Sequence, residues 1–357
     1  MKSNMKRLLA LILVCAMAMA MLTGCGKKEE NQPENTPSES QTNQDDGDQT
    51  PEPKVEDEEK EKLDINVAAL KGPTIMGMVK LMKDSDDGTT ANNYNVTVAG
   101  AADEVTAGLM KGDISIAAIP SNLASVLYNK SEGKVKVAAI NTLGVLYILE
   151  TGDSIQSVED LKGKTIYTTG KGTTPEYTLN YLLTSYGLDP EKDVTIEFKS
   201  EAAEVVSLLA GTENAIAMLP QPQVTIAMSQ NEKLRVALDV TKEWEAKAEN
   251  GSTITTGVIA VNAKFLEEHP EAVEQFLTEY EASAKYANEN IDETAALLEQ
   301  YDIFKAGVAK KAIPMCNITF IRGDEMKTKL NGYLEVLFEQ NPQAVGGKLP
   351  ADDFYLK

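Results

Sequence analysis

From Leu63 onward, short apolar runs alternate with longer segments whose apolar residues recur at helical spacing. The first run, 63–70, alternates and then becomes fully apolar, which predicts a buried strand. Ile75, Met78 and Met82 then fall on one helical face. The same pattern predicts strands over 94–99, 114–119, 135–140 and 145–149, with helices over 102–110 and after 120–122. Such alternation in this first unit predicts an α/β fold with a parallel, doubly wound sheet.

A second unit repeats this alternation. It opens with a turn or short helix at 158–163 and continues with strands over 164–169, 194–198, 215–219 and 234–238, separated by helices after 174, over 203–209 and after 223. From about residue 253 the pattern changes to one more strand, 256–261, followed mainly by helix. The apolar stripe of the helix after His269 predicts core packing.

The N-terminus has a different pattern, in which three basic residues precede a 15-residue apolar run over 8–22. This run fits an export signal and is short for a membrane-spanning helix. It ends in Leu22-Thr23-Gly24-Cys25, which looks like a bacterial lipobox. We expect 1–24 to be a signal peptide and Cys25 to be acylated, which would anchor the protein to the membrane. The alternative is an ordinary signal peptide with a chance cysteine.

Residues 25–62 form an acidic segment in which Val55 is the only aliphatic side chain. From 26 to 62 there are 13 acidic and 5 basic residues, a net charge of −8. Such a segment buries too little apolar surface to offset its ordering entropy, so we expect a disordered tether.

Charge and residue counts exclude several classes of function. The chain carries −21, of which −16 remains on 63–357 once the +3 of the signal and the −8 of the tether are removed. This balance argues against nucleic-acid binding, which needs clustered Lys and Arg. Cys316 is the only cysteine after Cys25 and His269 is the only histidine. We expect Cys316 to be buried and His269 to lie at a helix cap, which leaves little material for Ser-His-Asp, Cys-His or zinc chemistry. No cofactor is expected.

Several loops follow predicted strands and precede predicted helices. Ligands of open α/β sheets bind at such positions, where helix N-termini offer free N–H groups. The candidate ligand-binding residues there are Gly72, Pro73, Thr74, Ser121, Asn122, Gly170, Gly172, Thr173 and Thr174. The alternative interpretation is that the Ser and Thr residues are ordinary helix caps.

Two other features carry less weight. Gly163-Lys164-Thr165 resembles the end of a phosphate-binding loop, but Val158 stands where that motif needs glycine, and the segment enters a strand rather than a helix. Trp244 could stack on a flat ligand, although packing is the favoured interpretation.

A family resemblance rests on the segments 69–74, 116–122, 160–166 and 218–222, with Asp-Leu-Lys-Gly-Lys and Pro-Gln-Pro among their motifs. Through these segments the chain from about residue 63 onward resembles the solute-binding proteins of nitrate, sulfonate, taurine and thiamine-precursor transporters. The resemblance implies a type II periplasmic-binding fold with two doubly wound lobes joined by two crossover segments. The implied lobes are 63–150 plus 245–357, and 151–240. Gln221 stands where relatives often carry an acidic residue, and it joins the candidate ligand-binding residues.

The resemblance implies a non-enzymatic, extracytoplasmic, lipid-anchored and monomeric substrate-binding protein of an ABC importer. Its partners would be a permease, an ATPase and a small polar or heteroaromatic solute held in the interlobe cleft. Two alternatives remain open: an enzyme on the same fold, similar to menaquinone-pathway proteins, or a surface receptor lipoprotein without transport.

Overall fold

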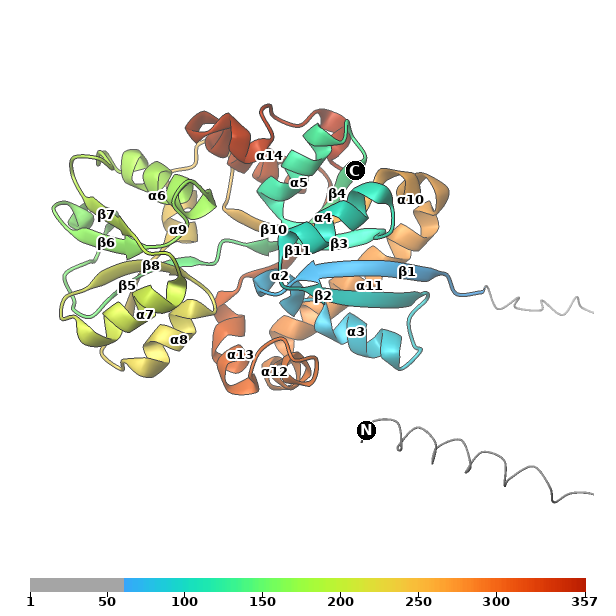
Figure 1. Cartoon of the computed structure of the whole chain (residues 1–357), viewed down its shortest axis with the longest axis horizontal. Coiled ribbons are helices and arrows are strands. Elements are labelled where there is room, and N and C mark those ends of the chain that lie inside the picture. The colour runs from blue at the N-terminus through green and yellow to red at the C-terminus, as the bar shows by residue number, and fades with distance from the viewer. Residues whose placement is uncertain (1–60) are drawn as a thin grey trace, which may run out of the picture. The chain divides into compact units, whose positions relative to one another are not determined.

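The structure, a computed structural model, describes residues 61–357 (Figure 1). The predicted signal peptide, Cys25 and the tether up to residue 60 lie outside the described residues. The described residues, 61–357, lie in one compact unit that contains two β-sheets. Among the described helices, none is both long and apolar enough to cross a membrane.

The first sheet has six strands. From edge to edge these are β11 (Ile318–Ile321), β4 (Val135–Leu143), β10 (Thr255–Asn262), β3 (Ile116–Pro120), β1 (Asp64–Leu70) and β2 (Asn93–Ala99). β1 is parallel to β2 and β3, whereas β10 is antiparallel to β3 and β4, and β11 is antiparallel to β4. The sheet is therefore mixed, which differs from the parallel sheet that the alternation predicts. β10 runs in reverse because the chain returns through it from the second sheet.

The helices packed around the first sheet come from both ends of the described chain. They are α2 (Pro73–Met76), α3 (Val79–Asp86), α4 (Ala102–Lys111), α5 (Ser121–Lys130), α10 (Ala263–Glu268), α11 (Pro270–Glu289), α12 (Ile291–Gln300), α13 (Ala306–Ala312) and α14 (Gly323–Gln340), with 3₁₀ turns η2 (Ile313–Met315), η3 (Pro342–Val345) and η4 (Asp352–Phe354).

The second sheet has five strands. Their order is β7 (Thr195–Phe198), β6 (Thr165–Thr168), β8 (Ile216–Pro220), β5 (Leu146–Glu150) and β9 (Arg235–Asp239). β6 is parallel to both of its neighbours, and β5 is antiparallel to β8 and β9. Around the sheet lie η1 (Val158–Leu161), α6 (Thr174–Ser185), α7 (Ala202–Gly211), α8 (Gln223–Gln230) and α9 (Val240–Glu245).

The chain crosses between the sheets twice, at 144–145 and between α9 and β10. The strand predicted over 145–149 was assigned to the first unit, and that assignment is wrong because the strand is β5 of the second sheet. A fully apolar run indicates a buried strand but does not say which sheet it joins. Asn317 holds the first crossover, since its Nδ2 donates to the Gly144 carbonyl at 2.6 Å.

Most predicted elements are present, with two differences near the first crossover. The predicted helix after Thr74 is divided into α2 and α3 at Gly77, where a Cβ atom would lie 2.9 Å from Ile318 Cγ2 and 3.1 Å from the Tyr280 hydroxyl. This close approach explains why the chain turns at a glycine. The short strand β11, which packs there, was not predicted from the sequence.

The apolar core has three parts. One cluster packs α3 and α11 against the first sheet, and a smaller one packs α7 and α8 against the second. The largest runs through both sheets and includes α5, α6 and α14. The predicted apolar stripe of α11 is buried, as is Cys316, and burial raises the pKa of the Cys316 thiol to about 12. The packing interpretation of both is confirmed.

Candidate functional site

A cavity of about 190 Å³ lies between the two sheets, beside both crossovers. The first sheet contributes the β3–α5 junction and the start of β10, the second contributes the start of α6 and the end of β8, and α14 contributes one tyrosine. The lining residues are Pro120, Ser121, Asn122, Val145, Leu146, Thr174, Pro175, Pro220, Ile254, Thr255, Thr256 and Tyr333. Three predicted site residues, Ser121, Asn122 and Thr174, are therefore brought together.

Hydrogen bonds within the protein occupy some of the polar atoms that line the cavity. The Ser121 hydroxyl donates to the Thr255 carbonyl at 2.5 Å, and Asn122 Nδ2 donates to the Ala344 carbonyl at 3.2 Å. The hydroxyls of Thr174 and Thr256 have no hydrogen-bond partner among the described residues, and neither does Asn122 Oδ1. These three atoms are available to a ligand.

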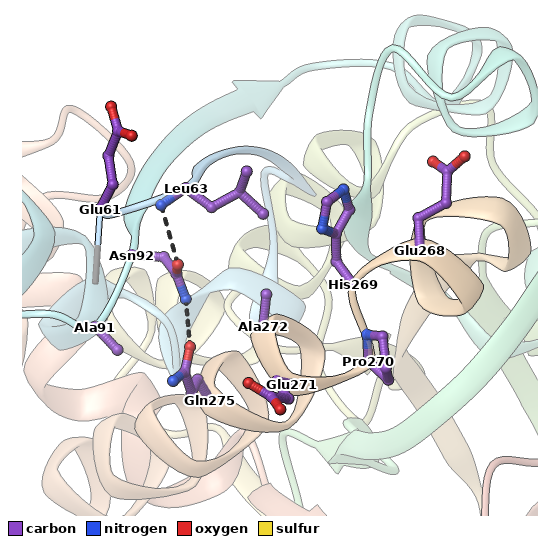
Figure 2. A pocket seen from close by; sticks show the side chains of 10 residues that line it. All are labelled: Glu61, Leu63, Ala91, Asn92, Glu268, His269, Pro270, Glu271, Ala272 and Gln275. Atoms are coloured by element: carbon purple, nitrogen blue, oxygen red, sulfur yellow. Dashed lines mark hydrogen bonds between the residues drawn. The ribbon is translucent and has the colours of Figure 1, made fainter. Parts of the chain in front are cut away.

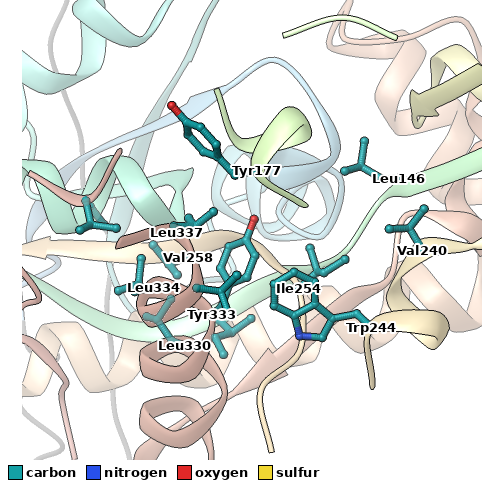
Figure 3. Close-up of a cluster of buried hydrophobic side chains, with 14 of the residues drawn as sticks. Leu146, Tyr177, Val240, Trp244, Ile254, Val258, Leu330, Tyr333, Leu334 and Leu337 are labelled. Atoms are coloured by element: carbon teal, nitrogen blue, oxygen red, sulfur yellow. The ribbon is translucent and has the colours of Figure 1, made fainter. Parts of the chain in front are cut away.

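Buried aromatic and aliphatic side chains pack around Tyr333 of α14, which lines the cavity (Figure 3). The Tyr333 ring lies 5.5 Å from Trp244, centroid to centroid, and Trp244 lies 4.0 Å from Tyr181 of α6. Trp244 is fully buried and does not line the cavity, so its packing interpretation is confirmed. Tyr333 was not predicted as a site residue, because it lies on the apolar stripe of α14 that also supplies Leu330 and Leu334.

The loop expected to hold a ligand through its amides is satisfied from within the chain. Glu176 accepts a hydrogen bond from the Gly172 amide at 2.5 Å, and the Thr173 hydroxyl donates to the Gly170 carbonyl at 2.5 Å. The Tyr177 hydroxyl donates to the Gly172 carbonyl at 2.8 Å. Gly170, Gly172 and Thr173 do not line the cavity.

The remaining predicted residues lie outside this cavity. Gly72 and Pro73 open α2, and the buried Thr74 hydroxyl donates to the Leu70 carbonyl at 3.3 Å. Gln221 is 2% exposed, and its Nε2 donates to the Met315 sulfur at 3.2 Å. These four residues are therefore not part of the lining that holds Ser121, Asn122 and Thr174.

A surface cavity of about 460 Å³ lies at the start of α11 (Figure 2). Asn92 links its two sides, because it accepts from the Leu63 amide at 3.2 Å and donates to Gln275 at 2.8 Å. His269 stands at the N-cap of α11, as predicted, with its ring against Phe265. Within 61–357, no group of three or more His, Cys, Asp or Glu side chains is arranged to hold a metal ion.

Comparison with known proteins shows a likeness to one family over the middle of the chain. The family described as NMT1/THI5 like matches residues 121–294, from the start of α5 into α12. This part of the chain is therefore similar to the NMT1/THI5-like family. The match includes Ser121, Asn122 and Thr174 of the cavity, both crossovers and the whole second sheet. Among curated proteins, none matches the chain.

Solved structures extend the likeness to nearly all of the described residues of the chain. An ABC transporter protein from Parabacteroides distasonis is 26% identical, with 82% of this chain and 98% of that one covered and a TM-score of 0.69. The periplasmic aliphatic sulphonate binding protein of Escherichia coli is 15% identical, with coverage of 82% and 92% and a TM-score of 0.66. The periplasmic nitrate-binding protein of Synechocystis PCC 6803 is 14% identical, with coverage of 82% and 83% and a TM-score of 0.53. The predicted family resemblance and the periplasmic-binding fold are confirmed.

Proposed function

We propose that this protein is the substrate-binding component of an ABC importer and captures a small solute in the cavity between its two sheets. The observation that carries this function is the position of the cavity. It lies beside both crossovers, and side chains from both sheets and from α14 line it. A solute held there contacts both halves at once, which is how a ligand favours a closed arrangement of two lobes.

The lobes follow the two sheets. One comprises about 63–143 and 255–357, and the other about 146–245, with rotation at 144–145 and 246–254. Among the hydrogen bonds that bridge them, the Tyr147 hydroxyl donates to the Met315 carbonyl at 2.9 Å, and Asn341 donates to the Tyr177 hydroxyl at 2.8 Å. Both bonds break when the lobes separate, so they stabilise only the closed arrangement.

Capture without covalent chemistry fits the lining of the cavity. Catalysis of acyl or proton transfer needs a nucleophile or base within hydrogen-bond reach of a reacting atom. The one serine of the lining is committed to the Thr255 carbonyl, and the other lining residues are threonine, asparagine, tyrosine, proline and aliphatic residues. The cavity therefore offers shape and hydrogen bonds rather than an acid–base pair.

Location and partners follow from the transport function. The protein acts outside the cytoplasm as a monomer, anchored through acylated Cys25, with 26–62 as a tether that lets the body reach a permease and its ATPase. Radiolabelled palmitate incorporation into wild type but not Cys25→Ser tests the anchor.

The function is tested by recovering the solute and following its fate. Mass spectrometry of the small molecule released from denatured purified protein identifies it, and titration back into ligand-free protein follows Trp244 fluorescence. Trp244 reports closure because it packs against Tyr181 of α6 and Tyr333 of α14. Capture predicts a saturable fluorescence change and recovery of the molecule unaltered. Its conversion to a product would instead establish an enzyme.

A further inference from the structure

The cavity between the sheets has no charged side chain in its lining. Seven of its residues are proline, valine, leucine, isoleucine or tyrosine, and the others are serine, threonine and asparagine. Moving an ion from water into such surroundings is costly unless an opposite charge or several donors compensate it. The lining therefore restricts the charge of the solute more than it restricts the shape of the solute.

Several cations outside the lining are already engaged with other groups. Lys71, which follows β1, donates to the Asp302 carbonyl at 2.9 Å. Lys171, which precedes α6, lies 5.8 Å from the centre of the Phe198 ring and does not line the cavity. Arg235 of the second sheet is paired with the buried Glu150. An anion in the cavity would thus have no cationic side chain as a partner.

Prolines reduce the number of backbone donors at the two helix ends beside the cavity. Helix N-termini bind anions through their free N–H groups. However, α6 has a proline in its first turn, Pro175, and its preceding loop already binds a carboxylate, because Glu176 accepts from the Gly172 amide. Pro120, the N-cap of α5, lacks an N–H group of its own, so on that helix only the amides that follow it remain as donors.

What remains is a small set of neutral hydrogen-bonding atoms. The Thr174 and Thr256 hydroxyls can each donate or accept, and Asn122 Oδ1 can accept. They come from three different elements around a mainly apolar space of about 190 Å³. A cavity of about 150 Å³ is known to accommodate benzene, so this one has room for a single ring with a small substituent.

We propose that the cavity selects an uncharged, ring-sized organic molecule with apolar faces and one hydrogen-bonding edge, and rejects anions of the same shape. This inference rests on the proposed function and specifies its solute class. It separates this chain from what the names of its sulphonate-binding and nitrate-binding structural relatives state about their ligands.

Pairs of probes that differ only in charge test the proposal. Isothermal titration compares benzamide with benzoate and benzenesulfonate, and nicotinamide with nicotinate, on the wild-type protein at neutral pH. We expect each amide to bind at least about 100-fold more tightly than its anion, because the anion loses hydration without a charged partner. An anion that binds within about tenfold of its amide would overturn the proposal.

Variants tie the preference to the cavity. Thr256→Val keeps the shape of the side chain and removes one hydroxyl, so amide affinity should fall about three- to tenfold, with the anions still rejected. Thr256→Lys adds a cation at a half-buried position and should reverse the preference toward benzoate. An unchanged preference for the amide in a folded Thr256→Lys protein would contradict the proposal.

Identification of the molecule released from purified protein tests the solute class and the proposed function separately. A neutral molecule supports the solute class, whereas a charged molecule that competes with no amide overturns it and leaves capture intact. Protein that releases no molecule and binds none of the probes would overturn both the solute class and the proposed function.

Discussion

Gly144 lies at the first crossover, in contact with side chains that follow the second sheet. A Cβ atom at this position would lie 2.0 Å from Thr241 Oγ1 and 3.0 Å from Ile254 Cβ. Real Cβ atoms essentially never approach so closely, so Gly144→Ala forces both crossovers apart. Overpacking of this kind costs about 1–3 kcal/mol, which corresponds to about 2–10 °C in melting temperature for a chain of this size. Urea unfolding of the purified protein measures the change in the free energy of unfolding.

Gly72→Ala is the matched control, because nothing lies within 4 Å of a Cβ atom there and its backbone is extended. It should change stability by less than about 0.5 kcal/mol. Thr241 supplies the closest atom to Gly144, and its buried hydroxyl lacks a hydrogen-bond partner. Thr241→Ala should therefore recover part of the loss in the double variant. Equal stabilities of Gly144→Ala and Gly72→Ala, or no recovery in the double variant, would refute the close packing of the crossovers.

Three further predictions concern buried polar groups. Arg235→Met should lower the free energy of unfolding in urea by about 3 kcal/mol, because it leaves the 1%-exposed Glu150 carboxylate without its cation. Arg322→Met, at an exposed pair with Glu274, should lower it by under about 1 kcal/mol. Equal losses in the two variants would contradict the difference in burial. Burial raises the pKa of Tyr128 to about 12 and raises those of Tyr280 and Tyr333 further. The stability that comes from keeping these tyrosines protonated is fully present below the unfolded tyrosine pKa near 10 and is lost as pH rises through the folded values. Circular dichroism should therefore show unfolding that begins above about pH 10. An unchanged urea midpoint from pH 9 to 12 would contradict this prediction. Cys316, buried and with a raised pKa, should react with a thiol reagent at pH 8 only after unfolding; rapid labelling of native protein would show that the site opens.

The alternation of strands and helices was sufficient to predict most elements from the sequence, because each buried strand is a short apolar run between loops. The alternation could not assign β5 to a sheet, since the apolar residues of 146–150 fit either one equally well. β11 escaped prediction because it is only four residues long and pairs with β4 at a distance in the chain. Its position depends on packing against Gly77 and α11, which no local pattern encodes.

The candidate site stays a prediction, and the structure shows only which of its residues lie together. Ser121, Asn122 and Thr174, which follow predicted strands, line one cavity, since the ends of the strands determine where these residues lie. The same reasoning could not reveal that Glu176 occupies the Gly172 amide or that Gln221 faces Met315. Thr255, Thr256 and Tyr333 were missed because a strand start and an apolar helical stripe carry no sign of a cavity.

The central claim is that a solute binds between the sheets, and native mass spectrometry of three purified proteins tests it most directly. Thr256→Phe fills the cavity, while Thr97→Phe adds the same ring at an exposed position on β2. Wild type and Thr97→Phe should carry the same bound mass, lost on denaturation, and Thr256→Phe should carry none. An equal bound mass on Thr256→Phe would place the solute elsewhere and contradict the account.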